Sequence, residues 1–189
     1  MALSQRKRAA DPDRRLSTLR AFGANASGAS ALEFALVATP LILTLLGVLE
    51  VGIVYFATFN LESATSQAAR LIRTGQAQTQ GFNATQFKTE VCKHITAPIT
   101  CDGLRLDVRA YTSFGNAGSN PTTPLDGNGN LKTNFSYDPG TGGDVVVVRA
   151  FYEWPLTVLF PKDIDPGNMQ NGDRLLAATT VFRNEPFKQ

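Results

Sequence analysis

The most apolar stretch of the chain runs from residue 32 to residue 56 and contains only two charged residues, Glu33 and Glu50. At about 25 residues it is long enough to cross a hydrocarbon core of roughly 30 Å. A secretory signal has a shorter apolar core that ends at small residues, whereas here the small residues come first. The pattern therefore predicts a membrane anchor, not a cleaved signal or a buried core helix, with Tyr55, Phe56 and Phe59 at its outer boundary.

The helical pattern continues beyond the apolar run. Small and apolar residues recur at every third or fourth position, which is the spacing of one helix face: Ala57, Leu61, Ala64, Ala68 and Leu71. Gly75 and the polar run GQAQTQG that it opens are typical of a helix stop. One helix of roughly 69 Å is therefore predicted over residues 29–74. Glu50 would lie near the outer end of the span and extend its side chain to the membrane surface.

A second, shorter helix is predicted after the polar run. Asn83 is placed as its N-cap with Gln86 three residues later, and Phe82 and Phe87 flank this pair as a hydrophobic staple. Pro98 ends the helical pattern. The second helix should therefore begin at Asn83 and end before Pro98.

The rest of the chain has strand periodicity. Alternating or β-branched runs predict three strands, at residues 104–111, 145–154 and 175–182. The run of four valines at 145–148 indicates that the second strand is central and covered on both faces. Residues 112–143 are rich in Gly, Asn, Pro and Thr, and are interpreted as an exposed loop with a short hairpin around Asp126–Asn130.

Charge is distributed unevenly along a chain whose formal net charge is +2. Residues 1–28 have only Asp11 and Asp13 as acidic residues, against a larger basic set: Arg6, Lys7, Arg8, Arg14, Arg15 and Arg20. A basic tail before a membrane span predicts a cytoplasmic N-terminus, with the remainder outside. Because that remainder is faintly acidic, nucleic-acid binding by the folded part is not expected.

Cys92 and Cys101 are the two cysteines of the chain. In an extracytoplasmic compartment such a pair predicts a disulfide, and closing this small loop stabilises a domain by about 2–3 kcal/mol. A metal site that adds His94 is disfavoured because it lacks a fourth ligand nearby.

Other candidates for chemistry are weak. Asp126, Asn128 and Asn130 have the first ligand spacings of a calcium loop, but Leu131 and Tyr137 occupy the positions of its glycine and bidentate glutamate. A plain Asx or glycine turn is therefore favoured there. His94 is the single histidine and belongs to no recognisable nucleophile arrangement. We expect no enzymatic activity, cofactor or small-molecule substrate.

The segment GASALEF joins the basic tail to the apolar helix. A glycine, Gly28, is followed by the small Ala29, by Glu33 five positions later and by Phe34. A basic leader, this arrangement and an apolar helix, in that order, resemble the processing site of type IV prepilins and more closely the TadE-like family of tight-adherence pilus systems. FRNEPF, at residues 182–187, is similar to the tail of TadE-like chains.

The resemblance implies that a prepilin peptidase cuts between Gly28 and Ala29 on the cytoplasmic side. Glu33 would then pair with the new amino group at Ala29, of its own chain or of a neighbour, which offsets much of the cost of burying both charges. Partners implied in the same way are other pilus or pseudopilin subunits and the bacterial inner membrane.

The resemblance also implies a pilin-like α+β fold, with a long N-terminal transmembrane helix, a short second helix and a small antiparallel β-sheet. The expected division is a basic cytoplasmic leader (1–28), a TadE-like transmembrane and projecting helix (29–74) and an extracytoplasmic, periplasmic α+β domain (75–189). The implied function is that of a non-enzymatic minor pseudopilin of a type IVb, Flp-like pilus system, acting in pilus assembly and adhesion.

Three alternatives stay open at the level of sequence. The first is an ordinary signal anchor in which Glu33 is only interfacial. The second is an anchored binding module for carbohydrate or surfaces that uses residues 112–143. The third is an anchored hydrolase that would gather a nucleophile and a carboxylate around His94, and nothing in the sequence supports it.

Overall fold

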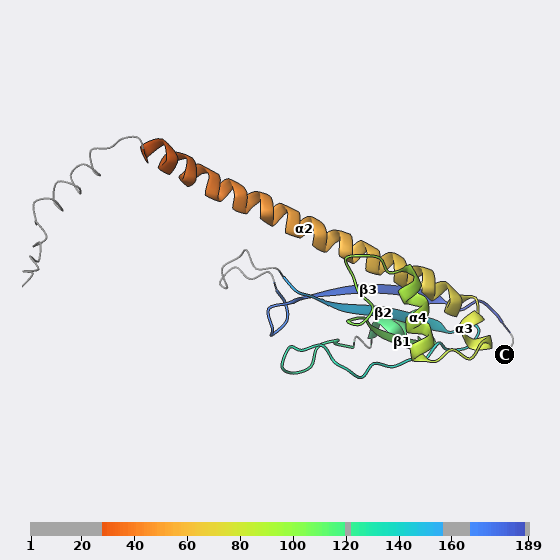
Figure 1. Cartoon of the computed structure of the whole chain (residues 1–189). Coiled ribbons are helices and arrows are strands. Elements are labelled where there is room, and N and C mark those ends of the chain that lie inside the picture. The colour runs from red at the N-terminus through yellow and green to blue at the C-terminus, as the bar shows by residue number, and fades with distance from the viewer. Residues whose placement is uncertain (1–27, 120–121, 157–166, 188–189) are drawn as a thin grey trace, which may run out of the picture. The chain divides into compact units, whose positions relative to one another are not determined.

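The α+β class predicted from the sequence is confirmed by a computed structural model, which describes residues 28–119, 122–156 and 167–187. Its elements are shown in Figure 1, and in chain order they are α2 (Ala29–Arg73), α3 (Gln76–Thr79), α4 (Ala84–His94), β1 (Arg105–Tyr111), α5 (Phe114–Ser119), β2 (Val145–Trp154) and β3 (Arg174–Arg183). The chain divides into two compact units, one up to Leu46 and one from Gly47 onward. All of α2 beyond the apolar run therefore belongs to the second unit.

The three predicted strands form one antiparallel sheet in the order β1-β2-β3. The valine-rich strand β2 is central, as its sequence predicts, and Val148 lies opposite Val108 of β1 and Thr180 of β3. Side chains alternate between the two faces of a sheet, so the even-numbered residues of these strands share one face. That face carries the core residues Val108, Val148 and Ala178.

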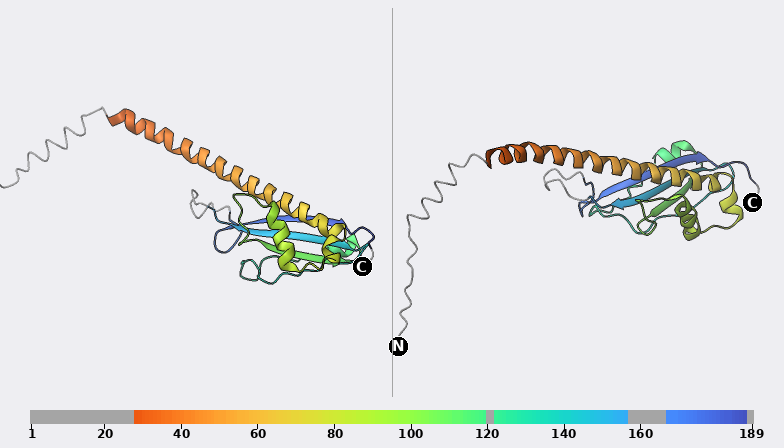
Figure 2. Two further views of the ribbon diagram at one scale, coloured as in Figure 1. Left: turned by 45° about the vertical axis from the view of Figure 1, so that its right-hand side comes forward. Right: turned by 45° about the horizontal axis from the view of Figure 1, so that its top comes forward.

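Helices α2 and α4 pack against this even-numbered face, and Figure 2 gives two further views of the arrangement. Alanines at positions 57, 64 and 68 of α2 are almost fully buried, and side chains of this size let a helix approach a sheet closely. The predicted stripe is confirmed except at its end, where Ile72 is buried and Leu71 only half-buried. The helix turns by 100° per residue, and this makes Ile72 the residue that continues the buried face.

Helix α4 begins as its sequence predicts. The side chain of Asn83 accepts a hydrogen bond from the amide of Gln86, and the side chain of Gln86 accepts one from the amide of Asn83, which is a complete capping box. Phe87 is fully buried and Phe82 packs against the same core. The segment after α4 is tied to α2 by buried Asn60, whose side chain donates to the carbonyl of Thr96 (3.1 Å) and accepts from its amide (3.2 Å).

The predicted helix stop at Gly75 is also confirmed. Gly75 has a φ of 79°, a left-handed conformation that favours glycine, and its amide donates to the carbonyl of Ile72. The polar run that follows contains one further helical turn, α3, which the sequence pattern did not predict.

Residues 112–143 are less exposed than the sequence suggested. The predicted hairpin is present, because Leu125 and Leu131 form a bridge around the turn. The segment also forms the short helix α5, which the sequence pattern did not predict. Tyr137 forms a parallel bridge with Val108 and contacts the ring of Phe87. Aromatic side chains within the segment thus hold part of it against the sheet.

Candidate functional site

The candidate processing segment lies at the N-terminal end of α2. The helix begins at Ala29, directly after Gly28, and the sequence-predicted site residues Gly28, Ala29, Glu33 and Phe34 are all exposed. No atom of the described residues lies within 4 Å of the position that a Cβ atom on Gly28 would occupy. The described part of this segment is therefore exposed at the start of α2.

Glu33 lies one helical turn after Ala29, about 6 Å further along the axis. Side chains on a helix tilt toward its N-terminus, so the Glu33 carboxylate extends back over the turn that begins at Ala29. Within the described residues Glu33 has no ion-pair partner.

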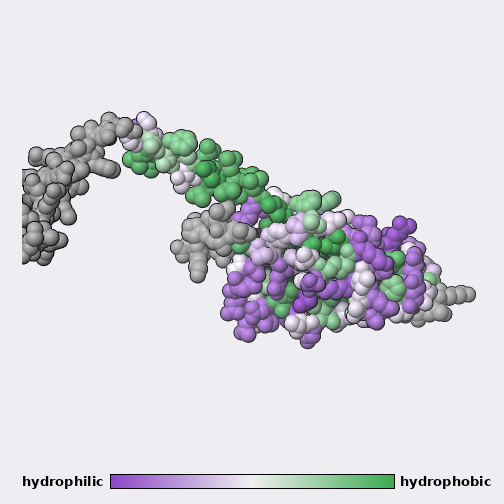
Figure 3. All heavy atoms as spheres, in the orientation of Figure 1, coloured by the Kyte–Doolittle hydropathy of each residue, from purple (hydrophilic) through white to green (hydrophobic). Residues whose placement is uncertain are grey.

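The side chains that follow form an apolar surface. Phe34 is 74% exposed and Leu32 is 64% exposed, and the most apolar 18 residues of α2 bury nothing within the chain. Figure 3 shows this surface as a green stretch along α2. In the part of the chain that the structure describes, α2 alone is long and apolar enough to cross a membrane. These observations agree with a single-pass anchor.

The structure places Glu50 differently from the sequence-based expectation of an outward-reaching side chain. Glu50 shares one helix face with Val54, Ala57 and Leu61, and that face is the one that continues into the core. Its carboxylate lines a groove of about 610 Å³ between α2 and the first residues of β3. Its Oε2 atom is buried and accepts no hydrogen bond from a described residue.

Cys92 and Cys101 are brought to disulfide distance, with their Cα atoms 5.8 Å apart. Cys92 lies in the last turn of α4, and Cys101 lies in the connection to β1. His94 ends α4 and is exposed. No group of three or more His, Cys, Asp or Glu side chains suited to a metal ion occurs among the residues described.

We predict that both cysteines resist alkylation in protein isolated from the cell envelope without reductant, and become reactive after reduction. Reduction, or a Cys92→Ser, Cys101→Ser double substitution, should lower the free energy of unfolding by about 2–3 kcal/mol because the unfolded chain gains freedom. Mass spectrometry after alkylation measures the first effect and denaturant unfolding the second. Two freely alkylated thiols in the untreated protein would contradict the bond.

Asp126 makes the turn that was favoured over a calcium loop. Its Oδ1 atom accepts hydrogen bonds from the amides of Asn128 and Asn130, both at 2.9 Å. This is an Asx turn, and it closes the hairpin between Leu125 and Leu131. The Asp126 carboxylate therefore stabilises the turn through these two hydrogen bonds.

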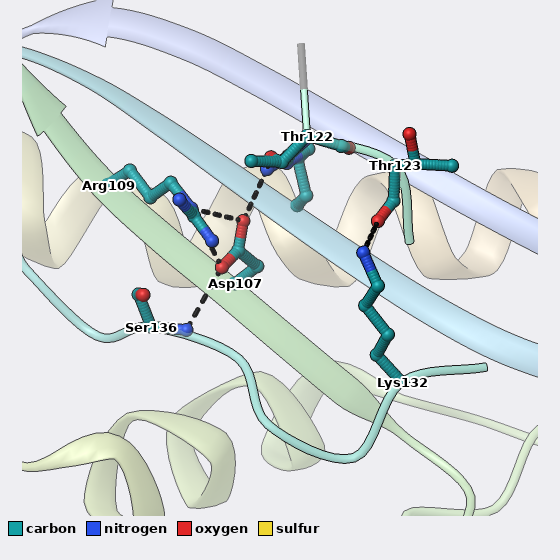
Figure 4. A network of polar contacts seen from close by, with 7 residues as sticks. Asp107, Arg109, Thr122, Thr123, Lys132 and Ser136 are labelled. Atoms are coloured by element: carbon teal, nitrogen blue, oxygen red, sulfur yellow. Dashed lines mark hydrogen bonds and ion pairs between the residues drawn. The ribbon is translucent and has the colours of Figure 1, made fainter. Parts of the chain in front are cut away.

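A buried charge cluster on the odd-numbered face of the sheet was not predicted (Figure 4). Asp107 of β1 is 1% exposed and lies opposite Arg149 of β2. It accepts hydrogen bonds from Arg109, from Arg149 and from the amide of Ser136 (3.0 Å). Arg149 in turn donates to the carbonyl of Thr122 (2.8 Å). The cluster therefore ties two points of the 112–143 segment to the sheet.

The charge state of Asp107 follows from these contacts. Burial by itself raises the pKa of this carboxyl, but the hydrogen bonds from Arg109, Ser136 and Arg149 outweigh burial, and the pKa lies below its ordinary value. Asp107 is therefore ionised in the folded protein at neutral pH. Two sequence features point to this cluster: Asp107 and Arg109 share one face of β1, and Arg149 interrupts the valine-rich strand β2. Strand periodicity alone does not show that they meet.

Residues 184–187 close the far end of α2. The amide of Glu185 donates to the carbonyl of Arg73, the last residue of the helix, and the two side chains form an exposed ion pair at 3.6 Å. Asn184 is buried and donates to the carbonyls of Pro139 and Thr141. The ring of Phe187 lies against Gly75, where any Cβ atom would come within 2.5 Å of it. The FRNEPF segment thus completes the helix end and needs a glycine there.

These features define a protein with one candidate membrane-spanning helix that continues into a small α+β domain. A family model described as TadE-like protein matches residues 28–70, which include GASALEF and most of α2. The resemblance drawn from the sequence is confirmed over this segment. The chain matches no curated protein and no solved structure.

Proposed function

We propose that the protein is a non-enzymatic minor pseudopilin of a tight-adherence pilus system and that it acts in pilus assembly. A prepilin peptidase removes residues 1–28, and α2 then anchors the mature chain in the inner membrane with its N-terminus cytoplasmic and residues 75–189 in the periplasm. The observation that carries this proposal is the TadE-like match at residues 28–70, which begins at the glycine of the proposed cut. The start of α2 at Ala29 supports it.

In this proposal, Glu33 neutralises the charge that cleavage creates. Cleavage after Gly28 creates a positively charged amino group at Ala29, at the edge of a hydrocarbon region where either charge alone is costly. A carboxylate one turn away, or on a neighbouring subunit, neutralises it. Two unit charges 4 Å apart attract by about 4 kcal/mol at an effective dielectric constant of 20. The pair therefore favours association of subunits in the membrane.

We predict that Glu33→Gln leaves cleavage intact but reduces association. Glutamine keeps the shape of the side chain and loses its charge, so the amino group at Ala29 loses its ionic partner in a poorly solvated place. The yield of crosslinks between membrane-embedded subunits, and to other pilus proteins, should fall about tenfold, which corresponds to about 1.4 kcal/mol. A gel assay of leader removal measures cleavage in the same samples.

Glu62→Gln is a matched control, because Glu62 lies on the same helix and is exposed. It should crosslink as the unmodified chain does. If Glu33→Gln crosslinks as efficiently as this control, Glu33 is merely interfacial and the assembly role assigned to it is wrong.

A further inference from the structure

A small cavity lies beside the Asp107 cluster, on the odd-numbered face of the sheet. Its volume is about 50 Å³, and its lining is shared between the sheet and the 112–143 segment. Asp107, Arg109 and Arg149 line it from β1 and β2, and Lys132 lines it from the segment. The cavity therefore lies where the segment is tied to the sheet.

The lining of this cavity carries more positive than negative charge. Arg109, Lys132 and Arg149 are the basic residues of the described lining and Asp107 is its one acid, so the formal excess is +2. The two carboxylate oxygens of Asp107 already accept hydrogen bonds from Arg109, from Arg149 and from the amide of Ser136. Asp107 thus neutralises one basic side chain and leaves two uncompensated. Positive charges gathered at a partly buried place repel one another, and an anion among them removes that repulsion.

Arg149 has one donor that its other contacts leave unused. Its two terminal nitrogens donate to Asp107 and to the carbonyl of Thr122. Its Nε atom is buried and has no hydrogen-bond partner among the described residues. A buried donor without an acceptor is destabilising, and more so when it belongs to a charged group. Because Arg149 lines the cavity, an acceptor bound there can take up this hydrogen bond.

Arg109 and Lys132 also keep donors for a ligand. Arg109 donates through its Nε atom to both carboxylate oxygens of Asp107 (3.1 and 3.0 Å), and its two terminal nitrogens have no partner within the described part of the chain. Lys132 donates one hydrogen bond, to the carbonyl of Thr123 (2.8 Å; Figure 4), whereas an ammonium group has three donors. Both side chains are partly exposed, so a ligand from solvent can reach them.

Aromatic packing holds one side of the cavity. Phe135 and Phe151 line it, and their stacked rings have centroids 5.4 Å apart. The guanidinium carbon of Arg149 lies 5.9 Å from the centre of the Phe151 ring. Arg149 is therefore held in position by a ring as well as by its hydrogen bonds. Because the rings exclude water from this side, charges in the cavity are screened less than charges on an open surface.

The size and charge of the cavity indicate the kind of ligand. Its volume is several times the roughly 10–15 Å³ that one water molecule needs. A single water molecule or halide ion leaves part of this space unfilled, whereas the four oxygens of a tetrahedral oxyanion meet donors on several sides. Guanidinium groups match the geometry of such oxygens. An ion with two negative charges also balances the formal excess of +2.

We propose that this cavity is a binding site for a small divalent oxyanion of the phosphate or sulfate class. Arg109 and Arg149 bind the ion through guanidinium donors, and Lys132 binds it through its ammonium group. The bound ion joins the 112–143 segment to the sheet, because its ligands come from both. The inference goes beyond the proposed function, since it depends neither on cleavage at Gly28 nor on the membrane helix.

The test observes Arg149 in the full chain, held in maltoside micelles because these carry no phosphate. Arginine Nε–H groups give separate signals in proton–nitrogen NMR spectra, and the Arg149 signal is identified by its loss in Arg149→Lys. Inorganic phosphate added at constant ionic strength should shift this signal along a saturable curve, and so should sulfate. Chloride should bind at least about tenfold more weakly. A signal from the site itself is needed because the basic residues of 1–28 also attract phosphate.

Lys132→Met tests the part of the site that the segment supplies. It removes one positive charge and keeps a long side chain, and it should weaken phosphate binding at the Arg149 signal by at least about tenfold. Lys93→Met is the matched control, because Lys93 is exposed on α4 and pairs with Glu90. It should leave the binding curve unchanged. If Arg149→Lys fails to fold, a spectrum that links the Nε–H group to the backbone of Arg149 identifies the same signal.

Three results would overturn the proposal. An Arg149 signal that neither phosphate nor sulfate shifts would mean that the cavity binds no oxyanion. Equal effects of phosphate and chloride at matched ionic strength would identify general screening and not a site. An unchanged binding curve in Lys132→Met would show that the ion does not bind between the segment and the sheet.

Discussion

Replacing Gly28 by valine should leave residues 1–28 attached to the protein, so that uncleaved chain accumulates in place of a chain that starts at Ala29. The physical reason lies in recognition by the peptidase and not in folding. Gly28 is exposed, and within the part of the chain that the structure describes nothing lies within 4 Å of the place where a Cβ atom would be added. The two forms differ in mass by the whole leader, so N-terminal sequencing and a gel shift measure the outcome directly.

Gly52→Val is the matched control, since Gly52 lies in the same helix and its Cβ position is equally open. It should be processed normally. A mature N-terminus at a residue other than Ala29, or normal processing of Gly28→Val, would remove the prepilin interpretation while leaving the membrane anchor intact.

The second large effect is expected at Asp107. Asp107→Ala leaves Arg149 and Arg109 without their buried carboxylate, and removing one partner of a buried charge pair costs about 3–5 kcal/mol. Because the Arg109 side chain is 34% exposed and partly solvated, the lower end is expected, about 3 kcal/mol. The melting temperature should fall by roughly 10 °C. Asp102→Ala, at an exposed carboxylate, should change stability by no more than about 0.5 kcal/mol.

Asp107 should also make the stability of the protein depend on pH. The pKa of Asp107 is lowered in the folded protein, so the unfolded chain takes up a proton first as the pH falls. The stabilisation is complete above the ordinary pKa of an aspartate, about 3.9, and is lost as the pH falls below it toward the folded pKa. Unfolding curves from pH 7 to pH 3 should show a steeper loss for the unmodified chain than for Asp107→Asn. Parallel losses would mean that other carboxylates control acid stability.

Features set by neighbours in the sequence could be predicted. The capping box at Asn83 and Gln86, the glycine stop at Gly75 and the valine-rich central strand each depend on residue types within a few positions of one another. The TadE-like segment is local for the same reason, since Gly28 directly precedes α2 and Glu33 lies five residues later in its first turns.

Features that depend on residues far apart were missed. In the sequence, Asp107 is one polar position of an alternating strand. Its role depends on Arg149, which lies 42 residues later and which the fold places opposite it. The direction of Glu50 depends on which face of α2 the sheet covers, and a hydropathy pattern carries no such information. The partial burial of residues 112–143 likewise depends on the contact of Tyr137 with Phe87, which no local signal encodes.

The contact between Glu185 and Arg73 has a consequence for the order of events during synthesis. The carbonyl groups at the end of α2 emerge from the ribosome first, and the amide that bonds one of them emerges roughly a hundred residues later. Phe187, which lies against Gly75, arrives later still. Until then the helix end stays open to water, and contacts between distant parts of a chain form slowly. Completion of the domain is therefore a late event that waits for residues 184–187, however early α2 forms.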